Sequence, residues 1–444
     1  MLYILLAMSI VCEDYFVASL TAIGIRFQLS DDVNGATLMA AGSSMPEVFS
    51  SLMALLSTTT DNSLGMATVS GSSVYNILVI IGWSAIAGKD IMLDWKPLVR
   101  DSVFYFITII YLIGTFSATT SDFPASDPLG ECTGCITLRF WNGAIAVLLY
   151  AFYVFFMTRN QRAYALMDAL AEKHSPFLHR KTTERLRIKA AAEGRRGGGA
   201  EAPLEGDAEL QPLHGEEEGG AGSKEKHEEE EEHEEDHLVW PAGASTLEKA
   251  KFVVKAPTFF LLCYTVPDCR SERWRQFYWL TFVTSIFWIA LLAKFLVDWA
   301  SSVACVLHVP DIIVGLTVLA AGTSLPDTLS SVIVARKGLG DMAVANAIGS
   351  NVFNVLFGLG MPWCLYTLFS EQGRSTGIRV PTSGLAANSF IMGAVGIFYL
   401  ATFTLRGFHM TARLGQVFIA IYAAYVIGVI ATYSGNAPSS TCVA

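Results

Sequence analysis

The stretch AAGSSMPEVFSS, residues 40–51, places a proline and a carboxylate inside a run that otherwise has the composition of a buried helix. Pro46 removes a backbone hydrogen bond from that helix, and an ionised Glu47 is costly in an apolar setting. The pattern returns 280 residues later as AAGTSLPDTLSS, residues 320–331, with Pro326 and Asp327 at the matching positions. A costly feature that occurs twice indicates a duplicated functional unit.

A second echo follows each copy, GSSVYNILVIIG at 71–82 and GSNVFNVLFGLG at 349–360. The repeated unit therefore comprises two successive helices. We place the first repeat at residues 35–82 and the second at residues 315–360.

The composition is that of a polytopic membrane protein. Of 444 residues, 52% are hydrophobic and 16% are charged, and the mean hydropathy is +0.44. Runs of roughly 20 apolar residues cross about 30 Å of hydrocarbon as helices. We predict ten such helices, at 2–23, 36–57, 66–87, 101–118, 138–158, 275–298, 311–335, 343–368, 386–404 and 414–433. The start, MLYILLAMSIVCEDYF, does not resemble a cleavable signal, so insertion rests on the helices unless an upstream segment is missing.

The predicted fold is therefore all-α, with about ten transmembrane helices in two inverted halves of five. The first membrane half covers residues 1–158, and the second covers residues 252–444. Residues 159–251 form an acidic, disordered loop that contains KEKHEEEEEHEEDH and is a candidate docking segment for an unknown regulatory partner. Its His and Glu tract, 227–237, is more typical of a solvated charge run than of a metal or proton sensor. Residues 252–277 are expected to be interfacial.

Basic residues give the orientation. With the large loop in the cytoplasm, eight Lys and Arg residues of the short loops fall inside and three fall outside, as the positive-inside rule requires. Both chain ends then face the exterior or an organelle lumen, and the membrane is the plasma membrane or an organellar one. Cys132 and Cys135 lie on that outer side and can be redox-active or bridged, whereas the other six cysteines are expected to be packing residues. The two repeats enter from opposite sides, an arrangement typical of transporters.

The spacing surrounds each carboxylate with oxygen atoms. Ser44 and Ser51 share the helix face of Glu47, as Ser324 and Ser331 share that of Asp327. The prolines are expected to leave nearby carbonyl groups poorly satisfied, and the following helix of each repeat adds one hydroxyl and one amide. The carbonyls are those of Ala40, Ala41, Ala320 and Ala321, the added pairs are Ser72 with Asn76 and Ser350 with Asn354, and glycines for close helix approach stand at 42, 71, 322 and 349. Oxygen ligands without His or Cys favour Ca²⁺ or Na⁺, and two carboxylates neutralise one Ca²⁺.

These motifs, together with VCEDYFVASL near the start, resemble those of the potassium-dependent sodium/calcium exchangers, within the calcium/cation antiporter superfamily. The resemblance covers roughly residues 1–158 and 252–433. It implies that Glu47 and Asp327 are the central Ca²⁺ and Na⁺ ligands. It also implies supporting roles for Ser43, Ser44, Ser72, Asn76, Thr323, Ser324, Ser350 and Asn354.

One position departs from that family. Potassium-dependent members resemble SNxFD where this chain reads SNVFN, so Asn354 replaces an aspartate linked to K⁺. The loss of a negative charge removes the electrostatic reason to bind K⁺, which makes K⁺ a doubtful substrate. We expect ion transport that does not require K⁺, in a chain that otherwise resembles the potassium-dependent exchangers.

The predicted function is secondary active exchange of Na⁺ for Ca²⁺ by alternating access, without enzymatic activity or a cofactor. The expected partners are the lipid bilayer and these two ions, and no nucleic acid. Exchange of H⁺ for Ca²⁺ remains open, as does a channel. GLGD at 338–341 matches a motif of intramembrane aspartyl proteases, but no partner motif occurs. Glu13 and Asp14 either attract cations at a vestibule or have a structural role.

Overall fold

The computed structural model describes residues 2–26, 40–56, 63–88, 91–117, 121–123, 132–158, 246–271, 274–381 and 383–434. Within these ranges, eight helices are long and apolar enough to cross a membrane, and a bent pair of helices forms a ninth candidate span. The all-α membrane fold is therefore confirmed. The count of ten is not, because the predicted span 36–57 is described only over 40–56.

The first half begins with one continuous helical segment, α1 (Leu2–Ile10), η1 (Val11–Val17) and α2 (Ala18–Arg26). It continues with α4 (Ala40–Ser43), α5 (Met45–Leu56), α6 (Ser63–Tyr75), η3 (Asn76–Ile80), α7 (Ile81–Gly88), α8 (Trp95–Phe116) and α9 (Phe140–Thr158). The segments η1 and η3 are π-helical.

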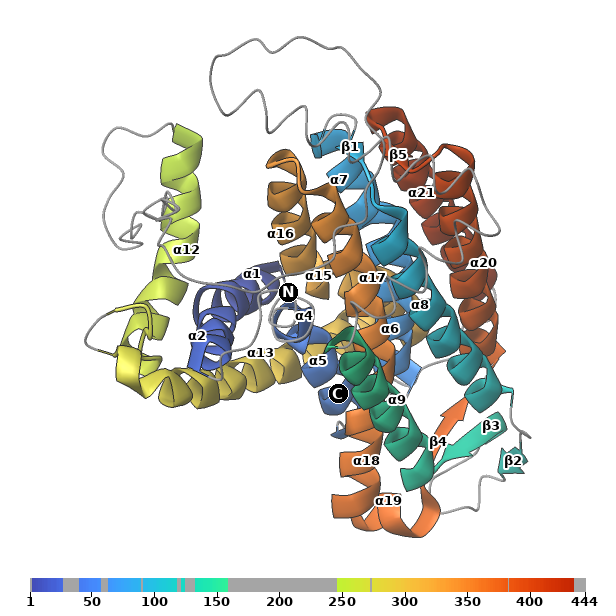
Figure 1. Ribbon diagram of the computed structural model, residues 1–444. Helices are drawn as coiled ribbons and strands as arrows, with labels where there is room; N and C mark the ends of the chain where they lie inside the picture. Colours follow the sequence, from blue (N-terminus) through green and yellow to red (C-terminus); the bar gives the residue numbers. More distant parts are fainter. Residues whose placement is uncertain are drawn as a thin grey trace, which may run out of the picture.

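The second half begins with α13 (Tyr278–Val306). It continues with α14 (Asp311–Val314), the π-helical η5 (Gly315–Leu319), α15 (Ala320–Thr323), α16 (Leu325–Arg336), α17 (Gly340–Leu356), α18 (Gly360–Phe369), α19 (Glu371–Thr376), α20 (Ser383–Leu405) and α21 (Ala412–Ser434). In Figure 1, α13 lies across the direction of α8, α17 and α21 instead of running beside them.

The segment between the large loop and α13 is mostly helical, and its predicted interfacial position stays a prediction. Residues expected to be interfacial form α12 (Thr246–Thr265), which contains Pro257, followed by the short 3₁₀ turn η4 (Arg275–Phe277). Figure 1 shows α12 at the edge of the molecule, beyond α1 and α2. The predicted disordered loop lies outside the described residues as far as residue 245.

Two small sheets show how the halves are oriented. Strand β1 (Ile91–Met92), between the third and fourth helices of the first half, pairs with β5 (His409–Met410), between the fourth and fifth of the second. Conversely, β3 (Cys132–Leu138) lies between the fourth and fifth helices of the first half. It pairs with β2 (Ser121–Phe123) and with β4 (Ile378–Pro381), which lies between the third and fourth helices of the second half. The two sheets lie at opposite ends of the bundle (Figure 1).

This pairing between non-equivalent connections requires one half to be inverted relative to the other. In each half, the connection before the fourth helix and the connection after it lie at opposite ends of that helix. The connection before the fourth helix of one half can therefore pair with the connection after the fourth helix of the other only if the two halves have opposite orientations. The predicted inversion of the halves is therefore confirmed by backbone pairing.

Gly71 allows a close contact between the two repeats. A Cβ atom at Gly71 would lie 2.4 Å from the carbonyl oxygen of Leu316, on η5. The expectation of close approach fails at Gly349, where the nearest atom would be the Tyr153 hydroxyl at 3.6 Å, an ordinary contact.

Gly71→Ala is therefore expected to destabilise the protein by about 1–3 kcal/mol, because the obstructing atom belongs to the backbone and cannot rotate away. The matched control is Gly349→Ala, at the corresponding position of the second repeat. The measurement is the thermal unfolding midpoint in detergent, and equal midpoints for the two variants would contradict this account of the contact.

Candidate cation-binding site

The two carboxylates lie where two helices are broken. α4 and α15 end before Ser44 and Ser324, and α5 and α16 begin one residue later with proline in their first turn. Proline has no N–H for the preceding turn, but its fixed φ suits the start of a helix. The second break bends the chain by 44°.

Each break has the same local geometry. The carbonyl of Ser44 accepts the N–H of Val48 at 3.4 Å, and that of Ser324 accepts the N–H of Thr328 at 3.1 Å. Glu47 and Asp327 therefore lie in the first turns of α5 and α16, where free N–H groups favour a negative charge. Both side chains are fully buried.

Each repeat places hydroxyl groups beside the carboxylate of the other. Ser324 Oγ donates to Glu47 Oε1 at 3.0 Å, and Thr323 lies beside the same carboxylate. In the opposite direction, Ser43 and Ser44 lie beside Asp327. The site is thus formed between the repeats and is not a property of either one.

Amide groups join the second helices of the repeats. Asn76 Nδ2 donates to Asn351 Oδ1 at 2.9 Å and to Ser350 Oγ at 3.3 Å, and Ser350 also lies beside Asp327. Asn351 Nδ2 donates to the carbonyl of Ser73 at 3.2 Å. Sequence reasoning missed Asn351, although it stands opposite Ser73 in the aligned echoes.

The other predicted residues lie on the same elements. Ser72 precedes Asn76 by one turn, and its hydroxyl donates to the carbonyl of Val69 at 3.0 Å. Asn354 follows Ser350 by one turn on α17 and is fully buried. Ala40 and Ala320 are the first residues of α4 and α15.

Several buried polar atoms of these residues have no hydrogen-bond partner within the described ranges. They are Ser44 Oγ, Glu47 Oε2, Asn76 Oδ1, both carboxylate oxygens of Asp327 and both amide atoms of Asn354. Buried polar atoms are nearly always satisfied in native proteins. All but one of these atoms are oxygens, so the set fits a hard cation such as Ca²⁺ or Na⁺.

The expected role of the prolines needs a correction. A proline removes the hydrogen bond to the carbonyl four residues earlier, which belongs to Gly42 for Pro46 and to Gly322 for Pro326. The carbonyl of Ala320 instead accepts the N–H of Ser324 at 3.3 Å, so the prediction that Pro326 frees it was wrong. The carbonyl of Gly42 accepts a hydrogen bond from the Cys12 thiol at 2.8 Å.

The first helical segment covers both breaks. A Cβ atom at Gly42 would lie 3.0 Å from the side chains of Val17 and Leu20, and one at Gly322 would lie 2.5 Å from that of Leu5. Together with the bond from Cys12, these contacts pack α1, η1 and α2 over the ends of α4 and α15.

Two further expectations are settled outside the site. Asp341, of the GLGD motif, accepts the backbone N–H of Asp94 at 2.6 Å at the start of α17, which gives it a structural role. Cys135 is disulfide-bonded, in line with the expectation for the outer loop. Cys305 is also disulfide-bonded, so the prediction that it is a packing residue was wrong.

Inverted repeats that each place a carboxylate at a broken membrane helix define the class of protein, a secondary transporter. Sequence comparison gives the family. The model of the family described as "Sodium/calcium exchanger protein" matches residues 1–159 and 277–431, and the chain belongs to this family. Its members are transporters and not enzymes, so the protease alternative was wrong.

Curated relatives cover most of the chain. Sodium/potassium/calcium exchanger 4 of Mus musculus is 32% identical over 96% of this chain and 79% of its own length. Sodium/potassium/calcium exchanger 2 of Homo sapiens is 30% identical over 96% of this chain and 76% of its own length. The sodium-calcium exchanger NCX_Mj, solved after a soak in 10 mM Na⁺ and zero Ca²⁺, aligns with a TM-score of 0.46 and 18% identity over 96% of both chains.

The Cys12 thiol gives a prediction about the freed carbonyl. Cys12→Ala is expected to lower the unfolding free energy by about 1–3 kcal/mol, because a buried carbonyl loses its donor. Cys12→Ser keeps a donor at the same position and serves as the control. Thermal unfolding in detergent would separate the two variants, and equal losses would mean that packing at residue 12, not the hydrogen bond, is what matters.

Proposed function

We propose that the chain exchanges Na⁺ for Ca²⁺ across its membrane by alternating access. The observation that carries the proposal is the reciprocal arrangement at the breaks, in which Glu47 binds the Ser324 hydroxyl and Asp327 lies beside Ser43 and Ser44. Two carboxylates balance the charge of one Ca²⁺ or of two Na⁺ ions. The two ions therefore compete for the same oxygens.

In this proposal Glu47 and Asp327 are the central ligands of the transported ions. Supporting oxygens come from the side chains of Ser43, Ser44, Ser72, Asn76, Thr323, Ser324, Ser350 and Asn354 and from the carbonyl of Ala40. The N-termini of α5 and α16 stabilise the carboxylates while the site exchanges one ion for another. An uncompensated charge costs at least ~2.5–3.5 kcal/mol in a bilayer. This cost disfavours the change from one open side to the other while the site is empty.

Alternating access requires a fixed body and a moving one. The two sheets pair connections of both halves at each end of the bundle, and so they support a rigid frame. The segment α1–α2 and the crosswise α13 contribute to neither sheet. We assign the movement to these helices, which slide over the breaks and open the site to one side at a time.

We also propose that transport is independent of K⁺. This rests on Asn354 alone, because the named relatives are sodium/potassium/calcium exchangers and their names do not favour independence. Asn354 is fully buried and contributes no negative charge. A K⁺ ion bound beside Ca²⁺ would add a third positive charge, for which the two carboxylates leave no counter-charge within the site.

The disulfide-bonded cysteines support the proposed orientation. Cys135, on β3, and Cys305, near the end of α13, both fall on the side that the basic residues assign to the exterior or a lumen. Disulfides persist on the oxidising side of a membrane. The large loop would then be cytoplasmic, in the plasma membrane or an organellar membrane.

Ca²⁺ uptake into proteoliposomes loaded with Na⁺ tests the coupling. We expect uptake that needs the Na⁺ gradient, and a loss of at least about 100-fold in Glu47→Gln, because removal of one charge from a buried charge pair costs about 3–5 kcal/mol. A pH gradient in place of the Na⁺ gradient is the comparison. Uptake driven only by protons would keep the site and make the protein an H⁺/Ca²⁺ exchanger.

The role of Asn354 is tested with Asn354→Asp. The wild type is expected to transport Ca²⁺ equally with and without K⁺, whereas the variant should require K⁺, because the added carboxylate restores a counter-charge for it. Asn76→Asp, at the matching position of the first repeat, is the control for added charge alone. Wild-type uptake that stops without K⁺ would refute the assignment.

A further inference from the structure

Glu13 is an exposed carboxylate in the middle of a membrane helix. It lies in η1, near the centre of the candidate span Tyr3–Gly24. Its neighbours Cys12 and Phe16 are buried, whereas Glu13 is exposed. A charge at this depth faces either hydrocarbon, at considerable cost, or water.

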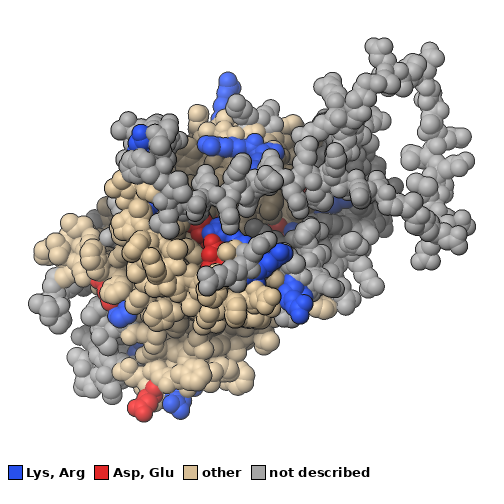
Figure 2. Space-filling model, turned by 90° about the vertical axis from the view of Figure 1, so that its left-hand side faces the viewer, with Lys and Arg blue, Asp and Glu red and all other residues tan. Residues whose placement is uncertain are grey.

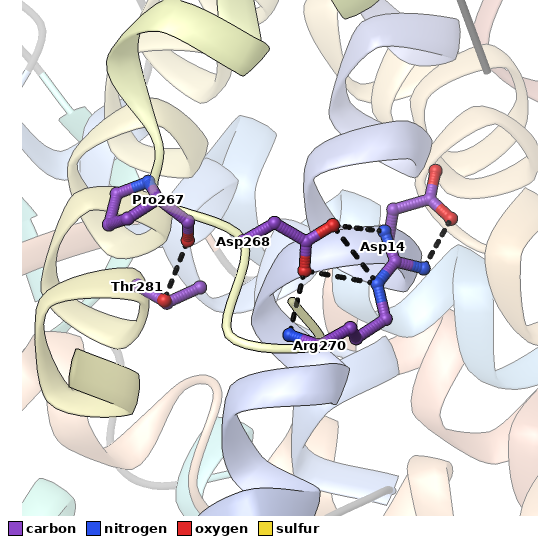
Figure 3. Close-up of polar contacts among 5 residues, drawn as sticks. All are labelled: Asp14, Pro267, Asp268, Arg270 and Thr281. Carbon is purple, nitrogen blue, oxygen red and sulfur yellow. Dashed lines mark hydrogen bonds and ion pairs between the residues drawn. The ribbon is translucent and has the colours of Figure 1, made fainter. Parts of the chain in front are cut away.

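The adjacent carboxylate, Asp14, has a cationic partner. Figure 3 shows Arg270, from the connection between α12 and α13, between Asp14 and Asp268. The guanidinium lies 3.7 Å from Asp14 Oδ1 and 3.0 Å from Asp268 Oδ2, and it stands 6.0 Å from the centre of the Tyr15 ring. Burial lowers the pKa of Arg270, but Asp268 and Asp14 raise it, and the net change is upward, so the group stays cationic.

This connection is itself held firmly against α13. Thr281 Oγ1 donates to the carbonyl of Pro267 at 2.7 Å, as Figure 3 also shows. The backbone just before Arg270 is thus anchored, and the guanidinium lies between Asp14 and Asp268.

Glu13 has no such partner. Across the described ranges, no Lys or Arg nitrogen lies within 4.0 Å of it, and its one hydrogen bond is a long one from Ser9 Oγ, at 3.4 Å. Lys255, on α12, and Asp327 are the more distant charges within electrostatic range. Figure 2 shows the side of the molecule on which α12 lies, where acidic and basic atoms occur together near the middle of a mostly uncharged face.

Glu13 is also close to the ion site through its neighbour. The Cys12 thiol binds the carbonyl of Gly42, five residues before Glu47, and Cys12 lies within electrostatic range of both Glu47 and Asp327. The exposed carboxylate of Glu13 is therefore adjacent to a residue that bonds the broken helix of the site.

We propose that Glu13 lines a water-filled access path to the Glu47–Asp327 site and concentrates cations in it. This inference rests on the proposed exchange of Ca²⁺ and Na⁺. An isolated carboxylate raises the local cation concentration without holding any ion tightly, so ions can pass on to the pair inside. The compensated Asp14 does not contribute.

Thiol labelling tests the water-filled path without any transport assay. Glu13→Cys should react with a positively charged, membrane-impermeant methanethiosulfonate reagent, with modification read by peptide mass because native cysteines are present. Ile110→Cys, an exposed position on α8 expected to face lipid, is the control and should not react. Lack of reaction at residue 13 from either side of the membrane would refute the path.

The electrostatic role is tested by transport kinetics of Glu13→Gln against Asp14→Asn. Because an electrostatic energy doubles for a divalent ion, the fold-change for Ca²⁺ should be the square of that for Na⁺. We expect the half-saturating concentrations to rise about tenfold for Ca²⁺ and about threefold for Na⁺. Asp14→Asn should change them less, and Glu13→Asp should restore them.

The outcomes separate the two ideas. Unchanged constants in Glu13→Gln, or equal changes for both ions, would refute the role of its charge. A wild type without Na⁺-driven uptake would refute the proposed exchange, whereas the labelling result at residue 13 would still decide whether water reaches it.

Discussion

The structure depends on one constraint: two carboxylates must be kept in an apolar interior without a permanent cationic partner. The charge of Glu47 is met by the N-terminus of α5 and by the hydroxyl of Ser324 from the opposite repeat, and that of Asp327 is met by the N-terminus of α16. Groups of this kind stabilise a negative charge without neutralising it, and the remaining charge is available to a mobile cation. A lysine or arginine at the same place would have abolished that affinity.

The two helix breaks and the three π-helical segments occur in the elements that surround the carboxylates. The two breaks turn helix ends toward the carboxylates, and the three π-helical segments lie in elements that pack around them. A π-turn widens the helix and shifts the side chains that follow, and such turns often occur at functional sites. In η1 it accompanies the bond from Cys12 to Gly42, and in η3 it begins at Asn76. Regular helices would have been more stable and would have presented fewer polar groups.

The sequence was informative where a costly residue recurs. Pro46 with Glu47 and Pro326 with Asp327 predicted the repeats and a disturbed helix at each proline, because an apolar helix does not retain such pairs without a function, whereas the predicted order of the helices gave the inversion. It could not predict contacts between distant residues, such as Cys12 with Gly42 or Asn76 with Asn351. The short strands were missed because β1 and β5, with two residues each, are too brief to show a period. The prediction of the freed carbonyl was wrong because it counted back too far from the proline. The carbonyl four residues before Pro46 belongs to Gly42, not to Ala40 or Ala41.

The paired strands join the two halves of the chain as an interface joins two subunits. Both sheets, the contact of Gly71 with Leu316 and the bonds around the carboxylates join one half to the other. The protein is thus organised as an antiparallel dimer whose subunits share one chain, and the proposed ion site is its subunit interface. In such a dimer each interface position occurs twice, and the two copies are free to diverge. Glu47 against Asp327, and Ser73 against Asn351, record that divergence, by which a symmetric site acquires two distinguishable sides.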